Sequence, residues 1–150
     1  MEKTLDKNPI CSAMAGIISV QYADIKNVEN YIPYSDGIIV SLKRGHAWSI
    51  IETDGITASC RHEGGGAYRH EVGMVYHGHQ AENDRALMEM TGHRFLLRIT
   101  DNNGTMWLYG TKECPLHMSY EYTNDGEADG ETAYRLTFSA LCPVPRLRVY

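Results

Sequence analysis

Residues 97–110 read Leu-Arg-Ile-Thr-Asp-Asn-Asn-Gly-Thr-Met-Trp-Leu-Tyr-Gly, and they form the clearest local pattern in the chain. The Asp-Asn-Asn-Gly run at 101–104 is typical of a tight turn, because these residues tolerate the backbone angles that a turn requires. Apolar and β-branched residues lie on both sides of it. The stretch therefore predicts a β-hairpin, with one strand over residues 94–100 and its partner over residues 106–109.

Strand patterns extend outward from this hairpin in both directions. Leu116, Met118, Tyr120 and Tyr122 alternate with polar residues, which is the period of two that a half-buried strand requires. Asp54-Gly55 is a typical hairpin turn and predicts that residues 46–53 pair with residues 56–62. Residues 26–36 are polar and predict a loop. Further strands are expected over 15–24, 38–42, 68–78 and 133–138.

One segment, residues 80–91, has apolar residues near helical spacing and is followed by Gly92, a common helix end. An order of strands, one helix and further strands predicts a mainly β fold: an antiparallel two-sheet sandwich or barrel with one flanking α-helix. We expect a single β-sandwich domain over residues 15–140. Polar arms over residues 1–14 and 141–150 are expected at its two ends.

Length and composition indicate one soluble acidic domain. The chain has 150 residues and a net charge of −5, with 14 Lys and Arg against 19 Asp and Glu. This balance offers no basic surface for holding nucleic acid phosphates. The start, residues 1–9, lacks the apolar core of a signal peptide, so we expect folding in a cytoplasm. The cysteines are then expected to be free thiols that behave as small buried apolar groups: Cys11, Cys60, Cys114 and Cys142.

Seven histidines raise the question of a metal site. One group of candidates is close in the sequence or shares a strand face: Cys60, His62, His70, His77 and His79. No third ligand spacing completes a site, so packing or surface histidines are favoured, and a metal-dependent enzyme remains a third alternative. Residues 125–130 resemble the start of a calcium loop, but Leu136 stands where a bidentate Glu is needed. We therefore expect no enzyme, no catalytic residue, no metal ligand and no cofactor.

Several of these segments together resemble small bacteriophage structural proteins of the tail-tube type. The similarity runs over roughly residues 11–140. The segments are Ile18-Ser-Val-Gln-Tyr22-Ala-Asp24, the helix at Glu82 to Gly92, the hairpin of residues 97–110 with Pro115-Leu116, Ser119-Tyr-Glu-Tyr122, and Tyr134-Arg-Leu-Thr-Phe138.

The resemblance implies a non-enzymatic virion protein of the phage tail, synthesised in the host bacterial cytoplasm. Its copies would form a hexameric ring around a DNA channel, and the rings would stack into a tail tube. A tail terminator, connector or hub ring is the alternative within this group, and a monomeric β-sandwich binding module is the alternative outside it. The implied partners are further copies of the chain, other phage tail proteins, and DNA that passes through the lumen without specific binding. No membrane partner is expected.

In such a ring, the loops over residues 26–37 and 61–67 would reach neighbouring subunits. The resemblance therefore implies a subunit interface that includes Asn27, Tyr31, Tyr34, Arg61, Gly64, Gly65, Gly66 and Tyr68.

Overall fold

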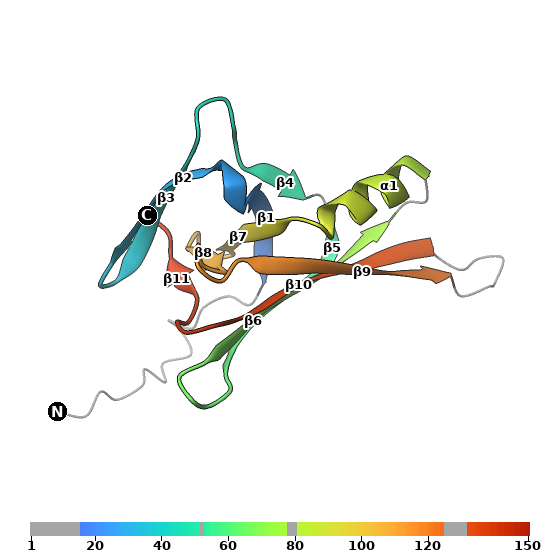
Figure 1. The fold of residues 1–150 in the computed structure, drawn as a ribbon. Coiled ribbons are helices and arrows are strands. Elements are labelled where there is room, and N and C mark those ends of the chain that lie inside the picture. The colour runs from blue at the N-terminus through green and yellow to red at the C-terminus, as the bar shows by residue number, and fades with distance from the viewer. Residues whose placement is uncertain (1–15, 52, 78–80, 125–131) are drawn as a thin grey trace.

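The computed structural model describes residues 16–51, 53–77, 81–124 and 132–150. Within these ranges the paired strands are antiparallel and there is one α-helix, which confirms the expected mainly β class with one flanking helix (Figure 1). The strands are β1 (Ile17–Asp24), β2 (Val28–Tyr34), β3 (Gly37–Leu42), β4 (Ser49–Ile51), β5 (Asp54–His62), β6 (Tyr68–His77), β7 (Arg94–Asp101), β8 (Met106–Tyr109), β9 (Leu116–Asn124), β10 (Thr132–Cys142) and β11 (Leu147–Arg148). The helices are α1 (Ala81–Met90) and the short 3₁₀ turn η1 (Ile25–Asn27).

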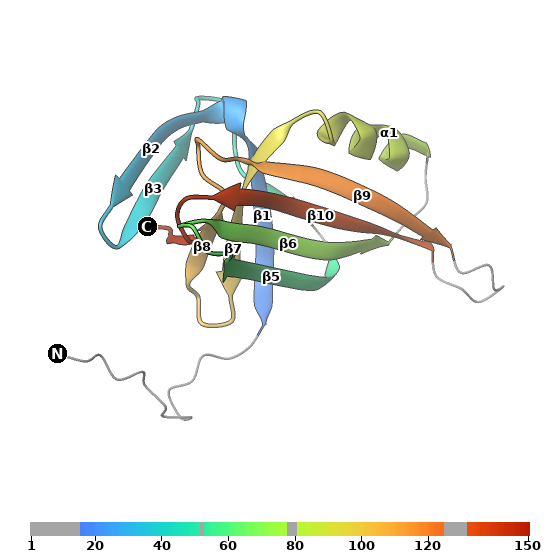
Figure 2. The same ribbon diagram turned by 60° about the horizontal axis from the view of Figure 1, so that its bottom comes forward.

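Strand β7 is the branch point of the main sheet. One edge pairs with β1 from Phe95 to Asp101. The other edge pairs first with β9, at Arg94 and Phe95, and then with β8, from Leu97 to Thr100. The sheet therefore divides at β7: one branch continues through β8 to β11, and the other continues through β9, β10 and β6 to β5 (Figure 2).

Both faces of β7 are buried, because successive side chains of a strand point to opposite sides. Phe95, Leu97 and Ile99 lie in the main core, between the β1–β7–β8 part of the sheet and the β9–β10–β6 part. Leu96 points the other way, into a second core beneath the hairpin of β2 and β3. The buried members of this second core are Val28, Ile38, Leu96, Leu108 and Val149.

Two local predictions are wrong for the same physical reason. Residues 26–36 were expected to be a loop, but β2 runs through them and pairs with β3. The expected hairpin at Asp54-Gly55 is also absent: both residues lie within β5, while β4 pairs with β1. In each case contacts with residues far away in the sequence, the second core for β2 and strand β1 for β4, outweigh the local turn preference.

The C-terminal segment, expected to be an arm over residues 141–150, is instead part of the domain. Leu141 and Cys142 complete β10, and β11 pairs with β8. The amide of Val149 donates to the carbonyl of Met106 at 2.9 Å, and the Val149 side chain is buried. Apolar residues within this segment thus anchor it to the second core. The expected N-terminal arm and the calcium-loop-like residues 125–130 lie outside the described residues.

Gly110 directly follows β8, at a position that favours glycine. Its φ is +85°, and a Cβ atom there would lie 3.0 Å from Cγ of the buried Leu116. Gly104, in the β7–β8 turn, has a similar φ of +80° but no atom within 4 Å of the same position. The two glycines therefore differ in crowding and not in backbone conformation.

Gly110→Ala should lower the free energy of unfolding by about 2–4 kcal/mol, because it adds overpacking to the strain of a positive φ. Gly104→Ala should cost about 1 kcal/mol, from backbone strain alone. Urea denaturation of both variants measures the difference. Equal losses of unfolding free energy in the two variants would show that the Leu116 side chain moves aside at little cost.

Candidate functional site

The predicted interface residues fall into two separate groups. Asn27 ends η1, and Tyr31 and Tyr34 lie on β2. The second group, from Arg61 to Tyr68, surrounds the turn between β5 and β6. Glu63 closes this turn by ion pairs with Arg69, at 2.8 Å, and with Arg61, at 3.7 Å. Gly64, Gly65 and Gly66 all have positive φ, and the space beside each of them is open.

The β2–β3 hairpin has an inner and an outer face. Tyr31 and its cross-strand neighbour Val40 pack inward against the second core. Burial, and then the charge of Glu113, raises the pKa of Tyr31 to about 12. Tyr31 therefore stabilises the attachment of the hairpin within the chain, and a contact of Tyr31 with a neighbouring subunit stays a prediction.

The outer side of the hairpin carries three large exposed apolar side chains. Ile32 lies directly opposite Ile39, and Tyr34 follows on the same face of β2. The exposed fractions are 44% for Ile32, 52% for Tyr34 and 38% for Ile39. We call these three residues the hairpin face. Ile32 and Ile39 were not among the residues expected from the sequence, because residues 28–34 show no regular alternation and a register shift lies between Val28 and Asn30.

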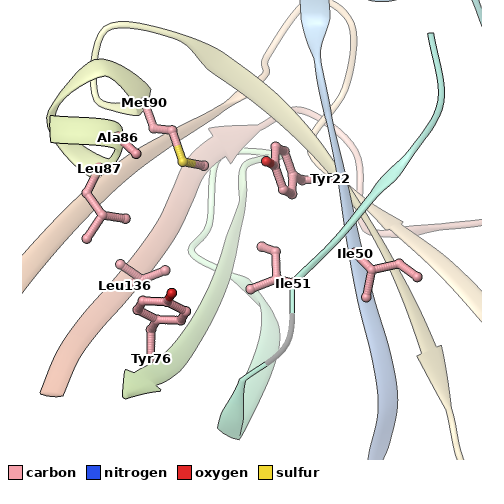
Figure 3. A pocket seen from close by; sticks show the side chains of 8 residues that line it. All are labelled: Tyr22, Ile50, Ile51, Tyr76, Ala86, Leu87, Met90 and Leu136. Carbon is pink, nitrogen blue, oxygen red and sulfur yellow. The ribbon is translucent and has the colours of Figure 1, made fainter. Parts of the chain in front are cut away.

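A pocket of about 380 Å³ lies between α1 and strands β1, β4, β6 and β10. Figure 3 shows Met90 and Tyr22 turned toward one another across its upper part, with Tyr76 and Leu136 below them. Ile51 of β4 also points inward, whereas Ile50 lies on the other side of that strand. We call this the α1 pocket, and its lining residues are Tyr22, Ile50, Ile51, Tyr76, Ala86, Leu87, Met90 and Leu136.

A second hollow of about 350 Å³ adjoins the α1 pocket and shares Tyr22, Ala86 and Met90 with it. Its polar part is a hydrogen bond in which Nδ1 of His93 lies 2.6 Å from Oδ2 of Asp24. The other carboxylate oxygen of Asp24 accepts from the amide of Lys26 at 3.1 Å. These contacts tie the turn after α1 to the end of β1, which fixes one wall of the pocket.

The described members of the histidine and cysteine group do not form a ligand set. His70 lies opposite Cys60, but both of its ring nitrogens are occupied: Nδ1 accepts from the Gly110 amide at 3.0 Å, and Nε2 donates to the Val144 carbonyl at 2.8 Å. His62 contacts the ring of Tyr68. The side chain of His77 and the whole of His79 lie outside the described residues. Within the described ranges, no three His, Cys, Asp or Glu residues are arranged to hold a metal ion.

Comparison of the chain with protein-family models, curated proteins and solved structures gives no match. Among the helices of the described residues, none has the length and apolar character needed to cross a membrane. The candidate sites therefore rest on the geometry of this chain: the hairpin face and the α1 pocket.

The buried His70 predicts a pH dependence of stability. Burial lowers its pKa below the ordinary value of 6.5 and outweighs the hydrogen bond to Val144. Below pH 6.5 the unfolded chain binds a proton at His70 that the folded protein excludes, so stability falls as the pH falls. This contribution should reach at most about 1.4 kcal/mol for each pH unit, until the lowered folded-state pKa is reached.

Urea denaturation from pH 7.5 to pH 4.5 measures this effect in the wild type and in His70→Gln. The His70→Gln variant should show a shallower loss of stability with falling pH. His117→Gln, at an exposed histidine on β9, is the control and should keep the wild-type slope. An identical slope in the wild type and in His70→Gln would contradict the inference that His70 causes this loss of stability.

Proposed function

We propose that this protein is a self-assembling structural subunit of a bacteriophage tail, whose copies form rings that stack into a tube and conduct DNA. Two things support the proposal. The sequence segments resemble tail-tube proteins, and the hairpin face exposes large apolar side chains that a second copy would cover. The hairpin face is the observation that carries the proposal.

Exposed apolar residues gathered on one projecting element are typical of interaction surfaces. Ile32, Tyr34 and Ile39 lie on one side of a two-stranded hairpin at the edge of the molecule (Figure 1). Among the described strands, β2 pairs only with β3, so its outer edge is also open. An open strand edge beside apolar side chains favours pairing with another protein chain.

The α1 pocket supplies a matching apolar surface. The hairpin and α1 lie at opposite sides of the molecule in both ribbon views (Figures 1 and 2). A contact between two different surfaces on opposite sides is head-to-tail, and repetition of such a contact gives either a closed ring or a filament. We infer that the hairpin face of one copy packs into the α1 pocket of the next.

The net charge of −5 is compatible with a DNA conduit. Binding of DNA through phosphates requires clusters of Lys and Arg, whose contacts would hold a moving duplex in place. A subunit with excess acidic residues would let DNA slide. The same head-to-tail contact would also serve a terminator, connector or hub ring, which differ from a tube in how many rings stack.

A monomeric binding module is the second candidate, and the α1 pocket is the observation that favours it. Its volume of about 380 Å³ falls within the range of small-molecule pockets. Its lining is mainly apolar, with two tyrosines, which suits a small apolar or aromatic ligand. The oligomeric state separates the two candidates, since a binding module of this kind stays monomeric.

The double variant Ile32→Ser, Ile39→Ser should assemble more weakly, because two apolar contacts between copies are lost. The protein concentration at which rings form should rise at least tenfold. Both side chains are exposed in the single chain, so its folding should be unaffected. Ile18→Ser is the matched control: Ile18 is 61% exposed on β1, outside both surfaces, and its replacement should leave assembly unchanged. Light scattering over a concentration series, with negative-stain microscopy, measures the effect.

Mixing tests the head-to-tail arrangement. Ala86→Glu places a charge at the exposed helix wall of the α1 pocket and should prevent assembly of that variant alone. A mixture with the hairpin double variant should form dimers and no rings, since one good hairpin and one good pocket remain. Mixtures that stay monomeric would contradict this arrangement. A wild type that is monomeric at high concentration would argue against self-assembly altogether.

A further inference from the structure

Three cysteines from distant parts of the chain meet at one end of the main sheet. Cys60 lies on β5, Cys114 in the turn between β8 and β9, and Cys142 at the last position of β10. The structure contains them as free thiols. Cys60 Sγ accepts a hydrogen bond from the amide of Arg146, at 3.4 Å, in the segment that follows Cys142.

Cys114 and Cys142 contact one another's backbone in both directions. Sγ of Cys114 donates to the carbonyl of Leu141 at 3.1 Å, and Sγ of Cys142 donates to the carbonyl of Cys114 at 3.4 Å. The Cys142 thiol thus contacts the backbone of Cys114, and the Cys114 thiol contacts the backbone of Leu141, the residue before Cys142. These contacts place the two cysteines side by side, and the Cys114 side chain is itself a hydrogen-bonding neighbour of the Cys142 thiol.

The turn that carries Cys114 is well defined. The amide of Thr111 donates to the Cys114 carbonyl at 3.1 Å, and the amide of Cys114 donates to the Thr111 hydroxyl at 2.9 Å. Cys114 is partly exposed at this turn, whereas Cys142 is buried. Burial, and next the adjoining Cys114 thiol, raises the pKa of Cys142 to about 12, so Cys142 is a protonated thiol at neutral pH. An oxidant in solution therefore meets Cys114 first.

We propose that Cys114 and Cys142 are a disulfide-forming pair that closes in an oxidising medium and fastens the β8–β9 turn to the end of β10. This inference is independent of the proposed function, because it concerns the folded single chain. In a reducing compartment the pair would stay as thiols, and in an oxidising one the disulfide would persist.

The chemistry needs a small-molecule disulfide such as oxidised glutathione. The Cys114 thiolate attacks one glutathione sulfur, the glutathione disulfide bond breaks, and one glutathione thiolate leaves. Cys142 then loses its proton and attacks the Cys114 sulfur, which releases the second glutathione thiolate. Two protein thiols are oxidised, one glutathione disulfide is reduced, and both protons end on the two glutathione molecules.

The cross-link would stabilise the C-terminal part of the domain. The two cysteines are 28 positions apart, so the disulfide would close a loop that contains all of β9 and β10. It would also hold the start of the segment that carries Val144, the partner of His70. A disulfide across a loop of this size is expected to raise the melting temperature by about 5–10 °C.

The experiment uses the full chain in a Cys11→Ser background, incubated with reduced or with oxidised glutathione. Oxidation should remove two hydrogen atoms from the intact mass and lower the free thiol count from three to one. Peptide mapping should find Cys114 linked to Cys142. Thermal unfolding should occur at a higher temperature after oxidation, and a thiol reductant should reverse the change.

Cys60→Ser is the matched control and should oxidise as the parent does. Cys114→Ser removes the exposed partner without altering the buried Cys142, and it should lose both the cross-link and the rise in melting temperature. The proposal is overturned by a stable glutathione adduct on Cys114, by a cross-link that involves Cys60, or by three unchanged thiols after oxidation. None of these results bears on ring assembly, which the scattering experiments test.

Discussion

The double use of one edge of β7 is the constraint on which the rest of the structure depends. That edge pairs with β9 and then with β8, while the opposite edge pairs with β1. The division of the sheet at this strand lets one strand serve two cores. It also separates the two candidate surfaces, since the β2–β3 hairpin covers the second core and α1 covers an end of the main core.

The C-terminal segment joins the two branches of the sheet through polar contacts. His70 on β6 accepts from Gly110, just after β8, and donates to Val144. Arg146 lies over the ring of Trp107, at 4.0 Å from its centre, and donates to the Tyr109 hydroxyl at 3.1 Å. These partners satisfy buried polar groups that would otherwise destabilise the fold. The β2–β3 hairpin is therefore attached to a part of the domain that these contacts hold together, which suits an element that would bear contacts between subunits.

The candidate sites were only partly foreseeable from the sequence. The segment over 26–37 was expected to be a loop that reaches a neighbouring subunit, but it contains strand β2, with Tyr31 facing inward and Ile32 and Ile39 on the outer face of the hairpin. Which face of a strand is exposed depends on what packs against the other face. For the hairpin that partner is Leu96 with Leu108 and Val149, whose positions are distant in the sequence.

The sequence by itself determined the β7–β8 hairpin, the period-two strand β9 and the helix that ends before Gly92, because turn residues and apolar periodicity act over a few neighbouring residues. Only the tertiary structure decided that β4 pairs with β1, which face of the β2–β3 hairpin is buried and that residues 147–149 join the domain. It also decided that Cys114 meets Cys142. Each of these depends on a contact between distant segments, whose free energy comes from burial and pairing in the complete fold and is not encoded in any short stretch.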